Sequence, residues 1–504
     1  MSRRTRSLVL VTALAAAALV GACLENLVNP QAGVARIQIV TPDSDVLIGH
    51  TLQLGIRAFN LAGAAVPAPA VKWQSGDPGF ITVDSTGLVT ATLFSLAGSF
   101  PVYATATEAA LADTFRVRVH LWGEVKWRVP LGVAPIGGGP AQGPDGTVYV
   151  LGEVDTASFA AATLFAVTPA GHVKWQQRLA EVDGSNYPVV GPDGAAYVVG
   201  LYVWAFNPDG SLRWSLTTRP YTIPNVPPPS SHAAALSADG VLFAAMDDYL
   251  LAFRTGTGDT AWARPRGIWL LPPSISKDGH TLYLAGIDSL YALDAGTSAR
   301  RWAVTDPDSA YRGGSTSGNG PAVFGGTIAA HTPFRLMDLD TSGTLIGFAL
   351  DVGDLSEPAI AGDGTLYAQT YAQQYGLHAF RPPTTQLWQA DGYRIRNNSS
   401  GGPALALGGI LDASTTVAFY SLQLSNTGVA VRWRYPRTGN LNFEGAPLIG
   451  PDGTVYTFTS CEYGRGIGPC TDELIAFWDD KPVEPTSPWP MWRHDARRSG
   501  QADR

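Results

Sequence analysis

Between residues 122 and 504 the sequence repeats itself, and this repetition constrains the fold more than any other feature. Six copies of the unit carry an Asp-Gly turn followed by an apolar strand, as in Asp145-Gly-Thr-Val-Tyr-Val. Aromatic markers recur 39 to 48 residues apart, at Trp127, Trp175, Trp214, Trp262, Trp302, Phe348, Trp388 and Trp433. A repeat of this length is the size of one four-stranded blade, so the pattern predicts an all-β propeller with tryptophans packed between blades.

The repeats predict eight blades. An eighth repeat follows Trp433 but lacks an outer strand of its own, whereas an extra strand around Trp127 precedes the first repeat. We expect that strand to close the ring as the outer strand of the last blade, which removes an exposed sheet edge. The fifth and seventh repeats are degenerate, because 320–326 and 408–412 replace the Asp-Gly strand, so a count of seven stays open.

The N-terminus is typical of an export signal. In residues 1–22, three arginines precede an apolar run from Leu8 to Val20, which is short for a membrane span. Val20-Gly21-Ala22-Cys23 resembles the lipobox of bacterial lipoproteins. That resemblance implies a lipidated Cys23, a linker over 23–33 and an outer-membrane location, with the side of the membrane left open.

Two further cysteines, Cys461 and Cys470, remain once Cys23 is assigned to the lipobox. An exported protein lies in an oxidising compartment, so we expect these two to form a disulfide. A metal site is the alternative, but two thiolates without a nearby His or third Cys are a poor zinc ligand set.

Residues 34–121 alternate apolar and polar side chains in short runs, which predicts a β-sandwich. The segments 49–54, 73–84 and 87–91 resemble the bacterial immunoglobulin-like domain, group 2. The resemblance implies a spacer or surface-binding module, and Trp73 is expected in the core between its sheets.

Segment 122–504 resembles the pyrroloquinoline-quinone-type propeller repeat family, and Trp489–Gly500 resembles a segment that recurs at the end of such arrays. Many members of the family do not bind the quinone. The dehydrogenase members use adjacent cysteines, which this sequence lacks, and its eight histidines show no metal-like spacing. We therefore expect no catalytic residue, no cofactor and no metal, with a calcium- and quinone-dependent dehydrogenase as the alternative.

The resemblances to lipoproteins and to propeller repeats, together with the missing dehydrogenase cysteines, lead us to expect a binding or scaffold protein of the cell envelope. Charged residues make up 15% of the chain, the formal net charge is −8, and no dense Lys/Arg cluster occurs, which argues against a nucleic-acid partner. A protein or glycan partner is expected, and the membrane is contacted through the lipid anchor. An accessory lipoprotein of outer-membrane β-barrel assembly is a further alternative, although the immunoglobulin-like module departs from it.

Loops that follow the marker aromatics should share one face of the propeller. Several carry Tyr, Trp and Arg, the residue types that often anchor interfaces. The candidate binding residues are Arg266, Trp269, Tyr311, Arg312, Tyr393, Arg394, Arg396, Asn442 and Phe443. The alternative is that these side chains pack the loops onto the disc or lie in solvent.

Overall fold

The structure is a computed structural model, and it divides into unit 1 (Met1–Glu124) and unit 2 (Val125–Arg504). Its described residues contain no helix, and hence none that is long and apolar enough to cross a membrane. The described residues are 33–135, 138–153, 161–180, 187–200, 202–217, 233–246, 249–265, 272–285, 289–305, 320–332, 335–350, 355–370, 376–382, 385–393, 401–437, 441–461, 471–488, 491, 493–495, 497–499 and 501–502.

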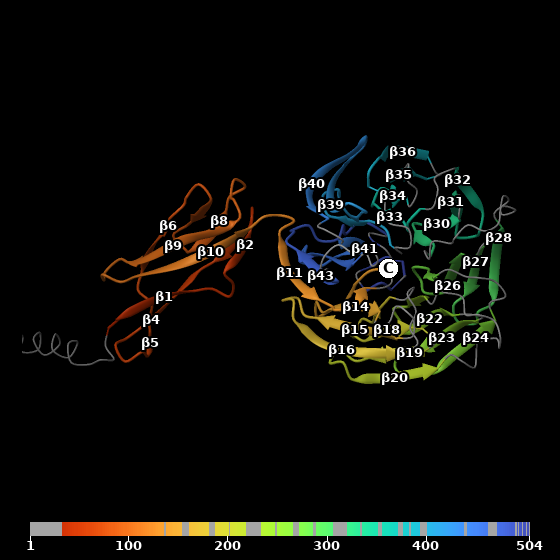
Figure 1. Cartoon of the computed structure of the whole chain (residues 1–504), viewed down its shortest axis with the longest axis horizontal. Coiled ribbons are helices and arrows are strands. Elements are labelled where there is room, and N and C mark those ends of the chain that lie inside the picture. The colour runs from red at the N-terminus through yellow and green to blue at the C-terminus, as the bar shows by residue number, and fades with distance from the viewer. Residues whose placement is uncertain are drawn as a thin grey trace, which may run out of the picture. The chain divides into compact units, whose positions relative to one another are not determined.

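Unit 1 consists of three sheets with the strand orders β1-β4-β5, β2-β10-β9-β6 and β3-β8-β7 (Figure 1). Its strands are β1 (Arg36–Val40), β2 (Asp45–Leu47), β3 (Thr51–Gln53), β4 (Gly55–Phe59), β5 (Ala65–Val66), β6 (Val71–Ser75), β7 (Ile81–Val83), β8 (Leu88–Ala91), β9 (Gly98–Ala106) and β10 (Ala112–His120). Alternate residues of these strands, such as Val102 and Val117, form the apolar core. Trp73 packs against this core, as its sequence context predicts.

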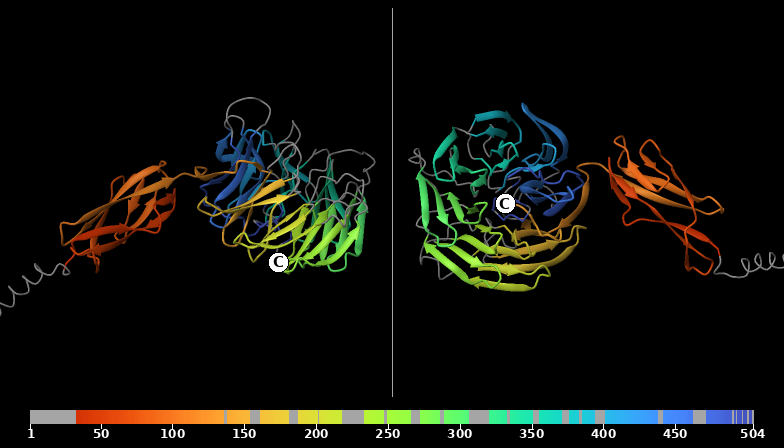
Figure 2. Two further views of the ribbon diagram at one scale, coloured as in Figure 1. Left: turned by 60° about the horizontal axis from the view of Figure 1, so that its bottom comes forward. Right: turned by 180° about the vertical axis from the view of Figure 1, so that it is seen from behind.

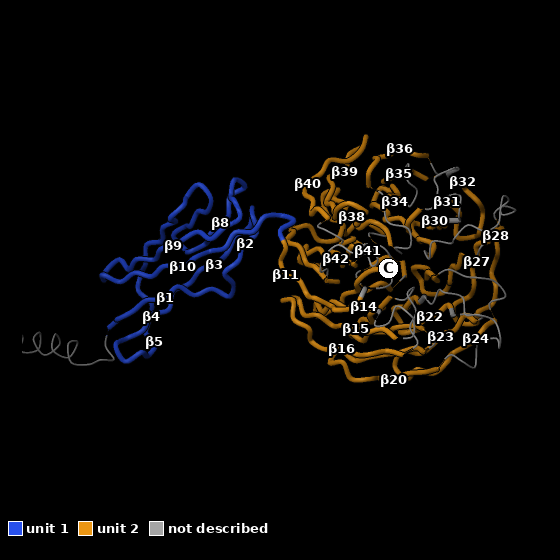
Figure 3. The backbone as a smooth tube through the Cα atoms, viewed as in Figure 1, with its two compact units in different colours: residues 1–124 blue, residues 125–504 orange. Residues whose placement is uncertain are grey.

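Unit 2 is a ring of antiparallel sheets, the blades of a β-propeller (Figures 1 and 3). In the described residues the blades are, in chain order: blade 1, β12 (Ala134–Pro135), β13 (Ala141–Gln142), β14 (Val148–Glu153), β15 (Ala161–Val167) and β16 (Val173–Ala180); blade 2, β17 (Val189–Val190), β18 (Ala196–Val199), β19 (Tyr202–Phe206) and β20 (Leu212–Thr217); blade 3, β21 (Ala233–Leu236), β22 (Val241–Met246), β23 (Tyr249–Arg254) and β24 (Thr260–Pro265); blade 4, β25 (Ser274–Ile275), β26 (Thr281–Ala285), β27 (Ser289–Asp294) and β28 (Arg300–Thr305); blade 5, β29 (Ala322–Phe324), β30 (Thr327–Thr332), β31 (Arg335–Asp340) and β32 (Leu345–Leu350); blade 6, β33 (Ala359–Ile360), β34 (Leu366–Gln369), β35 (Leu377–Arg381) and β36 (Thr385–Ala390); blade 7, β37 (Ala404–Ala406), β38 (Ile410–Ser414), β39 (Ala418–Ser425) and β40 (Gly428–Pro436); and blade 8, β41 (Leu441–Ile449), β42 (Val455–Cys461), β43 (Glu473–Phe477) and β11 (Val125–Pro130).

The first strand of unit 2 completes the last blade. β11 pairs antiparallel with β43, so strands separated by more than 300 residues lie in one sheet. Lys126 Nζ donates to Thr454 Oγ1 at 2.8 Å, and Trp127 Nε1 donates to the carbonyl oxygen of Pro169 in blade 1 at 2.8 Å. β11 therefore connects the end of the ring to its beginning.

The marker tryptophans are held in a common way. Trp175 contacts the ring of Tyr149 in its own blade, with centroids 5.7 Å apart, and its Nε1 donates to Pro208 O in the next blade at 3.0 Å. A Cβ added to Gly210 would lie 2.7 Å from Trp175 Cγ, so the ring lies directly on that turn. Tryptophans at the same place in other blades donate in the same way, namely Trp127, Trp214, Trp262 and Trp302.

Blade 5 departs from this arrangement. Phe348, the aromatic residue expected at the position of the tryptophans, lies one residue beyond that position. The tryptophans pair with a small residue of the third strand, as Trp302 pairs with Ala292. In blade 5 the corresponding pair is Asp338 with Gly347, not with Phe348. The spacing of the repeats predicted an aromatic residue there because Phe348 directly follows Gly347. Strand register, however, decides which face of the sheet a residue lies on.

Replacing Gly210 by Ala is expected to lower the free energy of unfolding by about 1–3 kcal/mol. Gly210 has φ 86°, and an added Cβ would also displace the Trp175 ring. Urea unfolding of the two proteins measures the difference. Gly364→Ala is the control, because Gly364 has a similar φ of 83° but a Cβ there meets no described atom within 4 Å; equal effects at the two positions would contradict the role of the tryptophan contact.

Candidate functional site

Most of the candidate loop residues lie outside the described residues: Arg266, Trp269, Tyr311, Arg312, Arg394 and Arg396. Cys23 and Cys470 lie outside them too. Cys461 ends β42, where its N–H donates to Asp472 Oδ1 at 2.7 Å. The Cys461–Cys470 disulfide therefore stays a prediction.

The expectation of exposed side chains at 442–443 is wrong. Asn442 and Phe443 belong to β41, and each is only 3% exposed. Phe443 packs edge-on against Phe419 and Tyr435. Tyr393 is half-buried, with its ring edge-on to Tyr420 at 5.0 Å. The rings of Phe443 and Tyr393 therefore pack against blade 7, which is closer to the alternative that these side chains pack onto the disc than to an exposed binding surface.

The C-terminal segment 482–502, here called the tail, runs along the innermost strands. Figure 1 shows the C-terminus in the middle of the ring. The tail meets the last or next-to-last residue of an inner strand in five blades: Glu484 N donates to Leu405 O, Ser487 Oγ to Ile360 O, Val190 N to Arg497 O, Leu236 N to Ser499 O, and Ala502 N to Ile275 O. It thus pairs with inner strand edges that would otherwise face the channel.

Two arginines of the tail are fully buried at the centre of the ring. Arg493 bonds to the carbonyl oxygens of Pro273 and Ala234, and its backbone N donates to Glu357 Oε1 at 2.7 Å. The Arg493 guanidinium also lies 3.8 Å from Glu357 Oε2, with both side chains at 0% exposure. These contacts connect blades 3, 4 and 6.

Arg498 makes similar contacts with the opposite side of the ring. Its guanidinium donates to Pro140 O at 2.9 Å and to Pro447 O at 3.0 Å, which connects blades 1 and 8. Burial lowers the pKa of Arg498 to about 10. Arg493 and Arg498 have φ 58° and 60°, a region that side chains rarely adopt, so their surroundings determine the tail conformation.

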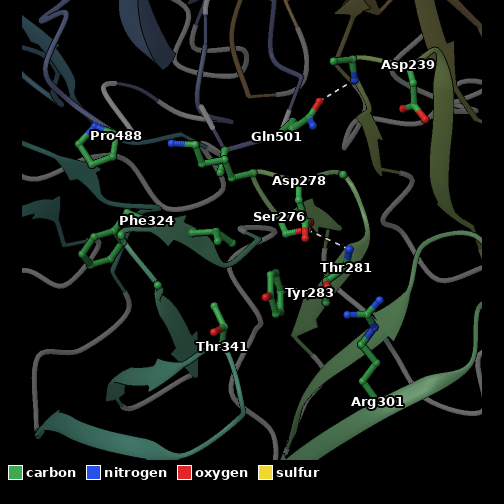
Figure 4. A pocket seen from close by; sticks show the side chains of 17 residues that line it. Asp239, Ser276, Asp278, Thr281, Tyr283, Arg301, Phe324, Thr341, Pro488 and Gln501 are labelled. Carbon is green, nitrogen blue, oxygen red and sulfur yellow. Dashed lines mark hydrogen bonds between the residues drawn. The ribbon is translucent and has the colours of Figure 1, made fainter. Parts of the chain in front are cut away.

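A pocket of about 1140 Å³ lies beside blade 5 on the face that carries the Asp-Gly turns (Figure 4). Val323 and Phe324 of β29 line it, together with Pro488 and Ala502 of the tail. The turn of blade 5 is Gly325-Gly326, with φ 48° and 83°, and it is shorter than the Asp-Gly turns. A smaller pocket of about 310 Å³ adjoins the other shortened turn, at Gly409 in blade 7.

The pocket has an apolar floor and a charged rim. Tyr283 and Phe324 are mostly buried, while Lys277, Asp278 and Asp239 are on the turns that surround them. A hydrogen bond from Ser276 Oγ is the main cause that lowers the pKa of Asp278. Within the described residues no group of three His, Cys, Asp or Glu side chains is placed to hold a metal.

Asp338 of blade 5 is 1% exposed, and neither of its carboxylate oxygens has a hydrogen-bond partner among the described residues. Burial raises its pKa to about 6. The folded protein therefore keeps a proton that the unfolded chain loses near pH 4, and stability falls as the pH rises from about 4 to about 6. Neighbouring blades have Ala at this position, as at Ala292 and Ala379.

Asp338→Ala is accordingly expected to raise the free energy of unfolding by about 1–3 kcal/mol above pH 7, and to change it little below pH 4. Urea unfolding at the two pH values measures this. Asp340→Ala is the control, because hydrogen bonds from Ser342 and Thr344 lower the Asp340 pKa and its loss should destabilise the protein. The same pH dependence in wild type and Asp338→Ala would refute the assignment.

The tail and the degenerate repeats are visible in the sequence, but nothing in the sequence connects either of them with a site. The available signals were the Gly-Gly pairs at 325–326 and 408–409, and the arginines of the C-terminal stretch, Arg493 and Arg498 among them. The structural role of these residues depends on contacts between distant parts of the chain, such as that between Arg493 and Ala234, which are 259 positions apart.

In its described residues unit 2 is therefore an all-β propeller whose blades have four strands, or five in blade 1, and whose own tail fills the centre. The family model described as outer membrane protein assembly factor BamB matches residues 118–267 and 201–391. Together they span 118–391, more than half of the 504 residues. The chain belongs to this family of propeller repeats.

Solved structures resemble the chain at low sequence identity. BamB from Moraxella catarrhalis has 13% identity and TM-score 0.47, covering 70% of this chain and 99% of that one. A chain of the mitotic checkpoint complex has 10% identity and TM-score 0.42, covering 71% and 92%. Hydrazine synthase of Kuenenia stuttgartiensis has 14% identity and TM-score 0.39, covering 54% and 91%. No curated protein matches the chain.

Proposed function

We propose that this chain is a non-enzymatic lipoprotein of the cell envelope whose propeller binds other proteins. The observation that carries the proposal is the membership of the repeat family described as an outer membrane protein assembly factor. In the proposed architecture an immunoglobulin-like spacer at 34–121 precedes eight blades, with β11 completing the eighth. A rigid ring with varied connections between strands suits protein binding.

The centre of the ring supports a binding role over a quinone-dependent one. Arg493 and Arg498 bridge the inner ends of five blades, so side chains of the protein occupy the place where a planar cofactor over the channel would lie. Assistance in outer-membrane protein assembly is the form of binding favoured by the family description.

Photo-crosslinking in cells tests the proposal. A crosslinking amino acid is placed at Lys277 beside the pocket, at Arg396 in a predicted loop, and at Leu212, which is 52% exposed on an outer strand, as the control. Position-specific adducts with the same envelope protein at Lys277 or Arg396 would support the proposal. Adducts equal to the Leu212 control at both positions would contradict it.

Cys23→Ala is expected to move the protein from the membrane fraction to the soluble envelope fraction, because it removes the proposed lipid attachment. Fractionation followed by immunoblotting measures the distribution. Cys461→Ser, which leaves the lipobox intact, is the control and should stay in the membrane fraction. Retention of Cys23→Ala in the membrane would exclude anchoring at this residue.

A further inference from the structure

The pocket beside blade 5 lies at an inner strand with which the described residues of the tail do not pair. In blades 7 and 6 the tail pairs with Leu405 and Ile360, and in blades 2, 3 and 4 it pairs with the residues at the same place in the inner strand. Val323 is the corresponding residue of blade 5, because it pairs with Ile328 as Ile275 pairs with Leu282. Among the described residues, no tail atom hydrogen-bonds to β29.

Two separate parts of the tail border this pocket. Pro488 directly follows the residue that bonds to blade 6, and Ala502 is the residue that bonds to blade 4. Pro488, Gln501, Ala502 and Val323 line one pocket, and Figure 4 shows Pro488 and Gln501 reaching it from separate segments. The strand edge that the tail covers in the neighbouring blades thus borders a cavity in blade 5.

We propose that this pocket binds an extended segment of a partner protein, which pairs with the inner edge of β29 at Val323. This inference rests on the proposed function and specifies its binding mode. In blades 2 and 3 the inner edge offers an N–H to the tail, and in blades 4, 6 and 7 it offers a carbonyl. Val323 has the same register, so a peptide backbone is the complementary ligand.

The side chains around the pocket define the chemistry of the segment. Tyr283, Val323 and Ala502 form an apolar surface suited to one small apolar side chain. The rim carries Lys277 and Arg301 against Asp239 and Asp278, so its formal charges cancel. Arg301 already donates to Asp294 at 2.9 Å. This balance favours an uncharged peptide segment over an anionic ligand such as a sugar phosphate.

The test pans a phage library of random eight-residue peptides against the full-length protein and measures the selected peptides by calorimetry. Ala238→Trp places a large side chain in the pocket wall, while its backbone N–H still donates to Gln501 Oε1. Pro192→Trp, at the same place in the exposed turn of blade 2, is the matched control. Circular dichroism and the melting temperature check that both variants fold.

Supporting results are peptides that bind wild type and Pro192→Trp equally, bind Ala238→Trp at least tenfold more weakly, and protect amides 322–324 from hydrogen exchange. The proposal is overturned if no peptide is selected, if Ala238→Trp binds equally well, or if protection falls elsewhere. If Ala238→Trp still forms the photo-crosslinked adduct, the pocket is not the binding site of that partner protein. The proposed function would then still stand.

Discussion

Replacing Arg493 by Met is expected to lower the free energy of unfolding by about 3–5 kcal/mol. The substitution leaves the Glu357 carboxylate buried beside an apolar side chain, and it removes the donors to Pro273 O and Ala234 O. Removing one partner of a buried ion pair costs far more than removing an exposed one, because the remaining charge loses its compensation without regaining water. Urea unfolding measures the loss.

Arg381→Met provides the matched control. Arg381 bonds to Asp363 at 3.3 Å, but both side chains are more than half exposed, so a change below about 1 kcal/mol is expected. Adding Glu357→Met to Arg493→Met should recover part of the loss, since the unpaired carboxylate is then gone. Equal losses for Arg493→Met and Arg381→Met would show that the central ion pair contributes little.

Ending the chain after Pro488 is expected to cost more than any single substitution, on the order of 5 kcal/mol, which is a large part of the stability of an ordinary domain. The deletion removes both buried arginines and the pairing of blades 2, 3 and 4 with the tail. Thermal unfolding measures the loss, and hydrogen exchange should show faster exchange at Val190 and Leu236, whose N–H groups donate to the tail.

Arg497→Ala is the control for this deletion. The Arg497 side chain bonds to Asp495 within the tail, whereas its carbonyl oxygen accepts from Val190 N, so the substitution keeps the contact with blade 2. An unchanged melting temperature after the deletion would mean that the ring closes without its tail.

The class of fold could be predicted from the sequence alone, because the repeated elements act locally. An Asp-Gly turn and an apolar strand specify a hairpin wherever they occur, and the recurring tryptophans specify contacts between neighbouring copies. The extra strand around Trp127 was also predictable, since the last repeat lacked an outer strand and β11 now lies in that sheet. These inferences required only spacing and residue type.

The residues of the candidate site, by contrast, come together only in the folded chain. Phe443 was expected in a loop and is buried in β41, because the strand extends further than the loop signals indicated. Gly347, and not the neighbouring Phe348, lies at the position of the tryptophans because of the strand register. A register shift of one residue would turn every side chain of the strand to the other face. The pocket exists because a shortened turn in blade 5 lies beside a tail that begins more than 150 residues later and bonds to the blades on either side. Such long-range contacts leave no periodic trace in the sequence, so spacing alone could not have located them.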